Sequence, residues 1–377
     1  MMTSLLKVYK VTVSEKTTWV FLRLIGPDRF EGIGEATANR RVDNVLAKVA
    51  ETADAASRAS HGLGAKLQAA RAHCEGVIGR AISSGLEQAW LDREGRRANR
   101  PIHTLLGGRY RSTVPCYANI NRGTLSRLPE EFAERAVRAV ADGYTAVKLA
   151  PFDDVRPEST NEDEREALIE AAIARVQAVA EAVAGQARIN VDCHSRLRPG
   201  EAANMLGRLA DIGISWFEEP IAETTEALDN ITRLREQAKT RGVTLAGAEQ
   251  SADLQAFLPF CQHQCYDVIM PDIVLAGGPA EVMRIAHFAN SCGIGLSLHN
   301  PCGPVMDMHS AQVAAAAPKL HSLERQFRES ALYDDLVGRS NIFEAGAYNV
   351  GDAPGLGLEI DWASPHMELV LEQAIEL

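Results

Sequence analysis

The sequence predicts an α/β protein in which a (β/α)₈ barrel follows an α+β first domain. After Pro115, eight short apolar runs alternate with longer amphipathic segments. Before it, strand patterns come first and helix patterns follow. The length of 377 residues also exceeds what one hydrophobic core usually supports. We therefore place the first domain at residues 1–114 and expect the barrel to begin at residue 115.

The first domain opens with two strand patterns, at residues 6–13 and 18–25, which a polar turn at 14–16 separates. From about 45 to 99 the sequence is rich in Ala, Leu, Arg and Glu at helical spacing. An antiparallel pair followed by helices indicates an α+β domain.

The barrel strands are predicted from the eight apolar runs at 116–120, 146–150, 189–194, 215–219, 245–249, 268–272, 295–299 and 320–324. Ala-rich periodic segments at 131–141, 162–184 and 279–291 fit the intervals as outer helices. The alternative is an open doubly wound sheet, but the glycine-rich phosphate loop typical of that fold is missing after the first of these strands.

Charge and terminal sequence exclude several function classes. The net charge of −11 disfavours nucleic acids and anionic membranes as partners, because phosphate binding needs clustered Lys and Arg. The N-terminus lacks a signal-type apolar run, and no segment has the apolar length to span a bilayer. We expect a cytoplasmic enzyme with reduced thiols, because its seven cysteines are odd in number and scattered.

One cysteine cluster, formed by Cys261, His263 and Cys265, resembles part of a zinc site. No second ligand pair follows at zinc-site spacing, so a metal-free connection between a helix and a strand is favoured.

Three neighbouring predicted strands each deliver a carboxylate near their ends, namely Asp192, Glu218 and Glu249. In a parallel barrel these ends form the active-site face, and adjacent strands lie about 5 Å apart. Converging carboxylates repel one another unless a cation joins them. Oxygen ligands without a soft ligand favour Mg²⁺, with Mn²⁺ as a substitute. The alternative is three unrelated acids at polar strand ends.

Two histidines and a lysine accompany the carboxylates. Because side chains alternate along a strand, His194 lies on the same side as Asp192, which favours a catalytic over a packing role. Lys148 lies in an apolar strand and needs a nearby anion, for which a substrate carboxylate is a candidate. On the opposite side, Asp272 would orient His299 and raise its basicity.

In this order the motifs resemble the enolase superfamily, specifically its mandelate racemase-like branch. The motifs are Gly32-Ile-Gly-Glu35-Ala, Val147-Lys148, Asp192-x-His194, Phe217-Glu218-Glu219-Pro220, Glu249, Asp272 with Gly277-Gly278, His299-Asn-Pro, Glu324, and the closing Pro354-Gly-Leu-Gly-Leu-Glu-Ile-Asp361. The resemblance covers nearly the whole chain. It implies a modified TIM-like barrel at 115–344 and an α+β capping domain that residues from about 345 to 377 complete.

The resemblance also implies residue roles. Asp192, Glu218 and Glu249 would hold Mg²⁺, and His299 with Asp272 would form the base dyad. Glu324 would hydrogen-bond the carboxylate of a small-molecule substrate. Members of this superfamily lean toward symmetric assemblies, so the resemblance implies a homo-oligomer.

Two departures from the branch narrow the activity. Its racemases carry a second lysine two residues after the first, where this chain has Ala150. Cycloisomerases and dipeptide epimerases carry a lysine two residues before the strand-six aspartate, where this chain has Met270. The remaining arrangement is similar to that of galactonate-type dehydratases, which act on acid sugars.

We therefore expect a Mg²⁺-dependent acid-sugar dehydratase, a hydro-lyase of carbohydrate acid metabolism. His299 would remove the proton next to the carboxylate and His194 would protonate the departing β-hydroxyl, giving a 2-keto-3-deoxy acid. An alternative is a racemase or epimerase of a 2-hydroxy acid that uses the same enediolate, with His194 as second base. A remote alternative is a catalytically silent metal-binding scaffold.

The residues that read the rest of the substrate are open. Candidates for contacts with distal hydroxyls are Glu15, Lys16, Trp19, Arg40, Arg41, Asn119 and Arg196. Each of them also fits a turn, surface or packing role.

Overall fold

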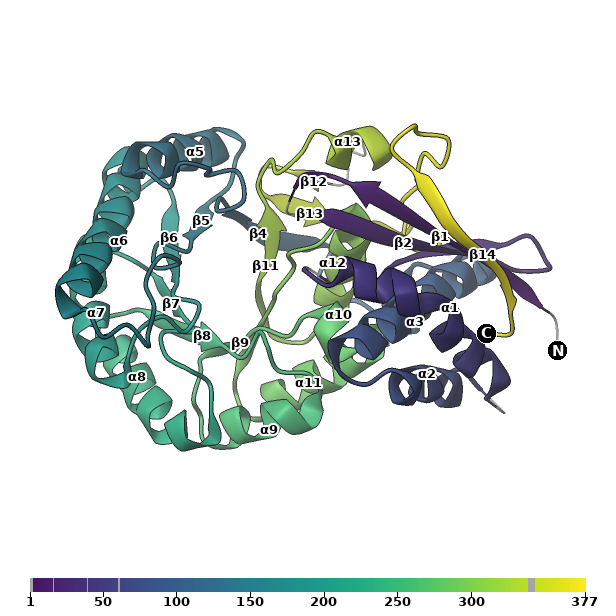
Figure 1. Cartoon of the computed structure of the whole chain (residues 1–377), viewed down its shortest axis with the longest axis horizontal. Coiled ribbons are helices and arrows are strands. Elements are labelled where there is room, and N and C mark those ends of the chain that lie inside the picture. Colours follow the sequence, from purple (N-terminus) through teal and green to yellow (C-terminus); the bar gives the residue numbers. More distant parts are fainter. Residues whose placement is uncertain (1–2, 16, 39, 60–61, 338–342) are drawn as a thin grey trace.

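The computed structural model describes residues 3–15, 17–38, 40–59, 62–337 and 343–377. Lys16 lies outside the described residues. An antiparallel sheet with the order β14-β1-β2-β3 lies beside a barrel (Figure 1). The strands of this sheet are β1 (Ser4–Thr12), β2 (Thr18–Ile25), β3 (Glu31–Glu35) and β14 (Glu368–Ile375). Between β3 and the barrel, the chain forms the helices α1 (Val42–Arg58), α2 (Gly62–His73), α3 (Gly76–Ala98) and the short α4 (Ile102–Leu105).

Eight parallel strands form the barrel, which closes because β11 pairs with β4 as well as with β10. They are β4 (Thr113–Asn119), β5 (Ala146–Leu149), β6 (Arg188–Asp192), β7 (Trp216–Glu218), β8 (Thr244–Gly247), β9 (Val268–Ile269), β10 (Gly295–Leu298) and β11 (Leu320–Gln326). The predicted (β/α)₈ barrel and the additional N-terminal sheet are thus confirmed.

Helices follow the barrel strands along the chain and surround them (Figure 1). They are α5 (Pro129–Ala141), α6 (Glu162–Val183), α7 (Pro199–Ile212), α8 (Leu228–Thr240), α9 (Leu254–Gln262), α10 (Ile273–Ala276), α11 (Pro279–Ser291), α12 (Pro304–Ala316) and α13 (Leu332–Val337), with a 3₁₀ turn at Thr225–Ala227. Their ends follow local chemistry. Asn161 caps the N-terminus of α6, where its side chain accepts a hydrogen bond from the Glu164 N–H, and Gly213 in the left-handed region caps the C-terminus of α7.

The chain after the barrel pairs with both sheets. The short strands β12 (Phe343–Glu344) and β13 (Ala347–Asn349) form a ribbon, and β13 pairs antiparallel with β4. Strand β14 then pairs antiparallel with β1 at the edge of the N-terminal sheet. The domain boundaries at 114 and 344 stay a prediction.

The Gly-Ile-Gly-Glu motif of β3 packs directly on α3 and on the barrel. A Cβ atom at Gly34 would lie 2.0 Å from the Gly85 carbonyl oxygen, so only glycine allows this contact between strand and helix. The neighbouring Glu35 is fully buried, and its carboxylate accepts hydrogen bonds from the N–H groups of Gly303 (2.7 Å) and Met306 (2.9 Å). Glu35 therefore caps α12 and fixes the loop that follows β10.

Replacing Glu35 with Ala is expected to lower the free energy of unfolding by about 1–3 kcal/mol, because two buried N–H groups lose their acceptor. A urea titration measures the change. Glu31→Ala in the same strand is the control, because its partly exposed ion pair with Arg23 is worth at most about 1 kcal/mol. Equal effects of the two variants would contradict the capping role.

Among the described residues, no helix is both long enough and apolar enough to cross a membrane. All seven cysteines are free.

Candidate active site

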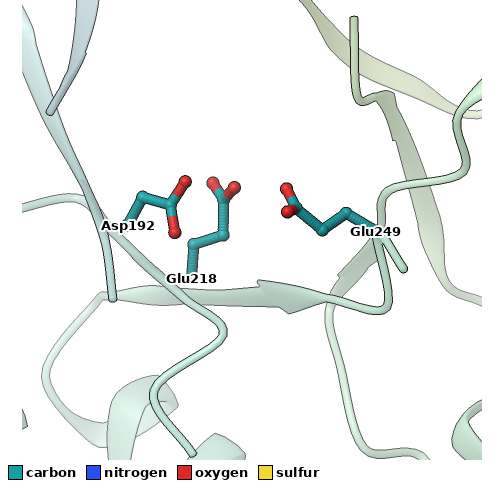
Figure 2. A group of neighbouring side chains, drawn as sticks. All are labelled: Asp192, Glu218 and Glu249. Atoms are coloured by element: carbon teal, nitrogen blue, oxygen red, sulfur yellow. The ribbon is translucent and has the colours of Figure 1, made fainter. Parts of the chain in front are cut away.

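Three carboxylates converge at the C-terminal ends of neighbouring barrel strands. Asp192 and Glu218 are the last residues of β6 and β7, and Glu249 lies two residues beyond the end of β8. One oxygen atom from each side chain lies within 4.8 Å of the others. Figure 2 shows the side chains extending toward a shared region, with Glu218 between the other two. The structure therefore brings together the three predicted ligands.

Unusual backbone conformations follow each of these strands. His194 (φ 44°), Glu219 (φ 39°) and Ala248 (φ 69°) are non-glycine residues in the left-handed region. Such residues cost about 1–3 kcal/mol each and concentrate at functional sites. Hydrogen bonds between the loops hold them, including Ser195 N–H to the Glu219 carbonyl at 2.7 Å. The chain thus turns sharply where the carboxylates enter the site.

The chemistry of these three carboxylates fits a hard divalent cation such as Mg²⁺. All three are at most 4% exposed, and Glu249 Oε2 is buried without a hydrogen-bond partner. Burial and the Asp192 charge raise the pKa of Glu218 well above its usual value. A set of buried carboxylate oxygens with no soft ligand suits Mg²⁺.

No second group of potential metal ligands is found within the described ranges. The triad is the only group of three or more His, Cys, Asp or Glu side chains there that lies close enough to share an ion. Cys261, His263 and Cys265 do not form such a group, and the metal-free interpretation of their spacing stays a prediction.

Lys148 on β5 lies inside the barrel against this group. Its Nζ atom is 2.7 Å from Glu218 Oε1, 3.1 Å from Glu324 Oε1 and 3.3 Å from Asp192 Oδ2. Burial alone would lower the pKa of Lys148, but Glu218 and Glu324 raise it well above its usual value. Lys148 therefore carries a positive charge at neutral pH. In this structure its anionic neighbours are three protein carboxylates, and its contact with a substrate carboxylate stays a prediction.

Glu324 on β11 is held as a carboxylate. It accepts hydrogen bonds from Asn119 Nδ2 (2.6 Å) and from the Asn300 N–H (2.8 Å). Burial alone would raise the pKa of Glu324, but Lys148 and His299 lower it to about 2. Asn119, a candidate for substrate hydroxyls, is therefore already engaged with Glu324. The proposed hydrogen bond from Glu324 to substrate stays a prediction.

His299 and Asp272 form a close pair at one end of the triad. His299 Nδ1 lies 2.9 Å from Asp272 Oδ2, and His299 Nε2 lies 3.4 Å from Glu249 Oε2. The other Asp272 oxygen caps α10 through the N–H groups of Val274 and Leu275, which fixes the carboxylate. Burial alone would lower the pKa of His299, but Glu249 and the hydrogen bond to Asp272 raise it to about 9.

His194 lies at the other end of the triad. Its Nε2 atom is 3.1 Å from Asp192 Oδ2, and its Nδ1 atom is 2.5 Å from Asp153 Oδ1. Burial alone would lower the pKa of His194, but Asp192 and Asp153 raise it well above its usual value. The sequence interpretation missed Asp153. The available signal was its place just after β5, where polar residues face the active-site end of a barrel.

The candidates for distal contacts differ in burial. Glu15, Arg40 and Arg41 are exposed, whereas Trp19 is 1% exposed. The ring of Trp19 packs against Gly303 and lies edge-on to Tyr333.

A second contact that the sequence did not predict is made by Trp216. Its Nε1 atom lies in the barrel interior and donates to Glu218 Oε2 at 2.6 Å.

Several known proteins are similar to this chain in sequence or in fold. A family model described as enolase C-terminal domain-like matches residues 131–364. The D-xylonate dehydratase of Haloferax volcanii is 31% identical over 293 residues, which cover 76% of this chain and 69% of that protein. The D-gluconate dehydratase of Thermoproteus tenax is 28% identical over 355 residues, covering 91% and 68%. A mandelate racemase/muconate lactonizing enzyme from Sulfitobacter sp has the same fold, with a TM-score of 0.80, 23% identity, and coverage of 96% and 94%.

Proposed function

The chain belongs to the enolase superfamily, in its mandelate racemase-like branch, and we propose that it is a Mg²⁺-dependent acid-sugar dehydratase. Its substrate would be a small polyhydroxy carboxylate, and its product a 2-keto-3-deoxy acid. The main support for the proposal is the pair of imidazoles, His299 and His194, which lie at opposite ends of one acidic triad. Relatives that dehydrate D-xylonate and D-gluconate support this reaction class.

Substrate binding would use the positive charges of the site. Asp192, Glu218 and Glu249 would hold Mg²⁺, which when bound stabilises negative charge that develops on the substrate carboxylate. The Lys148 ammonium, already in contact with two of these ligands, would add a second fixed positive charge. Burial of these groups excludes water, so their charges act through a low dielectric.

Proton removal would fall to His299. Asp272 holds Nδ1 and leaves Nε2 as the nitrogen that faces the triad. Nε2 would take the proton from C2, and the C–H electron pair would move into the carboxylate to form an enediolate. The Glu249 charge that raises the His299 pKa also belongs to the proposed metal site. A cation shared with Glu249 would lower this pKa toward the range in which a base works at neutral pH.

Elimination would then involve His194. The enediolate would return to a carboxylate as its C1–C2 double-bond electrons form a C2–C3 double bond and expel the C3 hydroxyl. The Nε2 proton of His194 would neutralise this hydroxyl, so that water leaves. The resulting enol would take one proton from solvent at C3 and release its C2 hydroxyl proton to solvent, which gives the 2-keto-3-deoxy acid.

Racemisation or epimerisation is the second candidate, because the imidazoles lie at opposite ends of the triad and each would be able to exchange a proton with C2. This activity needs no leaving group at C3. It would convert a substrate into its C2 epimer without forming a ketone.

The His194→Asn variant separates the two activities. We expect it to lose keto product by about 10²–10⁴-fold, because the hydroxyl must leave unprotonated, while exchange of the C2 hydrogen through His299 persists. Mg²⁺-loaded protein is first screened against pentonates, hexonates, 6-deoxyhexonates and the diacids with a carbonyl reagent, and C2 exchange is followed in heavy water.

An epimer that accumulates without ketone in the wild type would favour the second candidate. Neither ketone nor exchange with any substrate of this panel would favour a catalytically silent scaffold.

A further inference from the structure

Two aspartate–histidine pairs occupy matching positions at the ends of the triad. At one end, His299 contacts Asp272 through Nδ1 and faces Glu249 through Nε2. At the other, His194 contacts Asp153 through Nδ1 (2.5 Å) and faces Asp192 through Nε2 (3.1 Å). In both pairs the aspartate lies outside the triad and binds the ring nitrogen that points away from it.

Asp153 is itself held in place by the protein. Its second oxygen, Oδ2, lies 3.5 Å from Arg127 Nη1. Arg127 Nη2 donates to the Ala150 carbonyl at 2.7 Å, so the guanidinium is tied to the end of β5. Arg175 on α6 donates to the Arg127 carbonyl (2.8 Å) and to the Pro151 carbonyl (2.6 Å). The Asp153 carboxylate is thus divided between one histidine and one anchored arginine.

We propose that Asp153 is the positioning residue of His194, and that the two form a second Asp–His dyad that acts in the elimination step. The hydrogen bond from Nδ1–H to Asp153 fixes the ring orientation and keeps the proton on that nitrogen. Nε2 is then the nitrogen presented to the departing hydroxyl. This inference rests on the proposed dehydratase function for its chemistry, but the pairing itself rests on the geometry.

The loop offers a matched pair of variants. Asp153→Asn removes the carboxylate that contacts His194. Asp154→Asn removes its neighbour, which contacts Arg127 (3.4 Å) and Arg175 (2.7 Å). Both side chains are about one-third exposed and both contact Arg127, so Asp154→Asn controls for the loss of an aspartate–arginine contact in the same loop. Thermal melting of both proteins checks that each folds.

In the kinetic assay, the probes are D-xylonate and D-gluconate with Mg²⁺-loaded protein. Asp153→Asn is expected to lower kcat for keto-acid formation by about 10²-fold with KM nearly unchanged, because a mispositioned acid affects the elimination step and not binding. Exchange of the C2 hydrogen should stay within about twofold of the wild type, because His299 and Asp272 are intact. Asp154→Asn should leave both rates within about twofold.

A spectroscopic measurement does not depend on turnover. In ¹H–¹⁵N spectra of histidine-labelled protein, the His194 Nδ1–H proton should be observable and protected from solvent exchange by its short bond to a carboxylate. His194→Gln assigns the signal. The signal should disappear in Asp153→Asn and persist in Asp154→Asn, a difference that a merely structural role of the loop would not produce.

The kinetic assay and the proton spectrum together distinguish failure of the Asp153 role from failure of the dehydratase proposal. If Asp153→Asn matches Asp154→Asn in kcat and in the proton spectrum, the positioning role is wrong even when the wild type is an active dehydratase. If the wild type forms no keto acid but the signal is lost only in Asp153→Asn, the dyad stands and the dehydratase proposal fails.

Discussion

Replacing His299 with Asn is expected to lower both keto-acid formation and exchange of the C2 hydrogen by about 10²–10⁴-fold. Both processes begin with the removal of the C2 proton, which His299 Nε2 is proposed to take while Asp272 holds Nδ1 at 2.9 Å. The rates are measured by the carbonyl assay and by deuterium incorporation. This pattern differs from that of His194→Asn, which should retain exchange.

The exposed His263 provides the control for His299. His263→Asn should leave both rates unchanged, because its ring contacts only the Pro259 carbonyl among the hydrogen bonds found in the described residues. Normal C2 exchange in His299→Asn would contradict the assignment of the base and would direct attention to His194.

Removing divalent ions is expected to abolish activity, and added Mg²⁺ should restore it. The buried carboxylates of Asp192, Glu218 and Glu249 repel one another without a cation, so binding should also stabilise the fold. Free Mg²⁺ at about 100 times its Kd adds about 2.7 kcal/mol to the free energy of unfolding. Activity with and without chelator, and melting against Mg²⁺ concentration, measure the two effects.

In Asp192→Asn, added Mg²⁺ should produce little stabilisation and should restore little of the activity. Asp211→Asn is the matched control, because Asp211 lies on α7 and its side chain forms a largely exposed ion pair with Arg241. The proposed metal site would be contradicted if activity persisted after complete chelation and the melting temperature did not depend on Mg²⁺ concentration.

Periodicity and strand-end chemistry were sufficient to predict the barrel and its three converging carboxylates. Buried parallel strands give short apolar runs, and the polar residue that ends each run marks the active-site face. Glu249 shows the limit of this argument, because it lies beyond β8 and reaches the site through the left-handed turn at Ala248.

Contacts between segments far apart in the chain were not predictable from local pattern. Strand β3 contains glycines, which weaken the strand pattern in the sequence. In the structure these glycines allow close packing on α3. The cap that Glu35 forms on α12 joins residues more than 260 positions apart. Asp153 lies 41 positions from His194, in a loop without regular spacing. The cytoplasmic location and homo-oligomeric state stay predictions of the sequence.

Dehydratase activity is tested most directly by the reaction of D-xylonate and D-gluconate with the Mg²⁺-loaded protein in heavy water, followed by NMR and mass spectrometry. We expect a 2-keto-3-deoxy acid that carries one solvent-derived deuterium at C3, because the enol formed by loss of water takes its C3 proton from solvent. Deuterium at C2 of recovered substrate or its epimer, with no keto acid formed, would contradict dehydration.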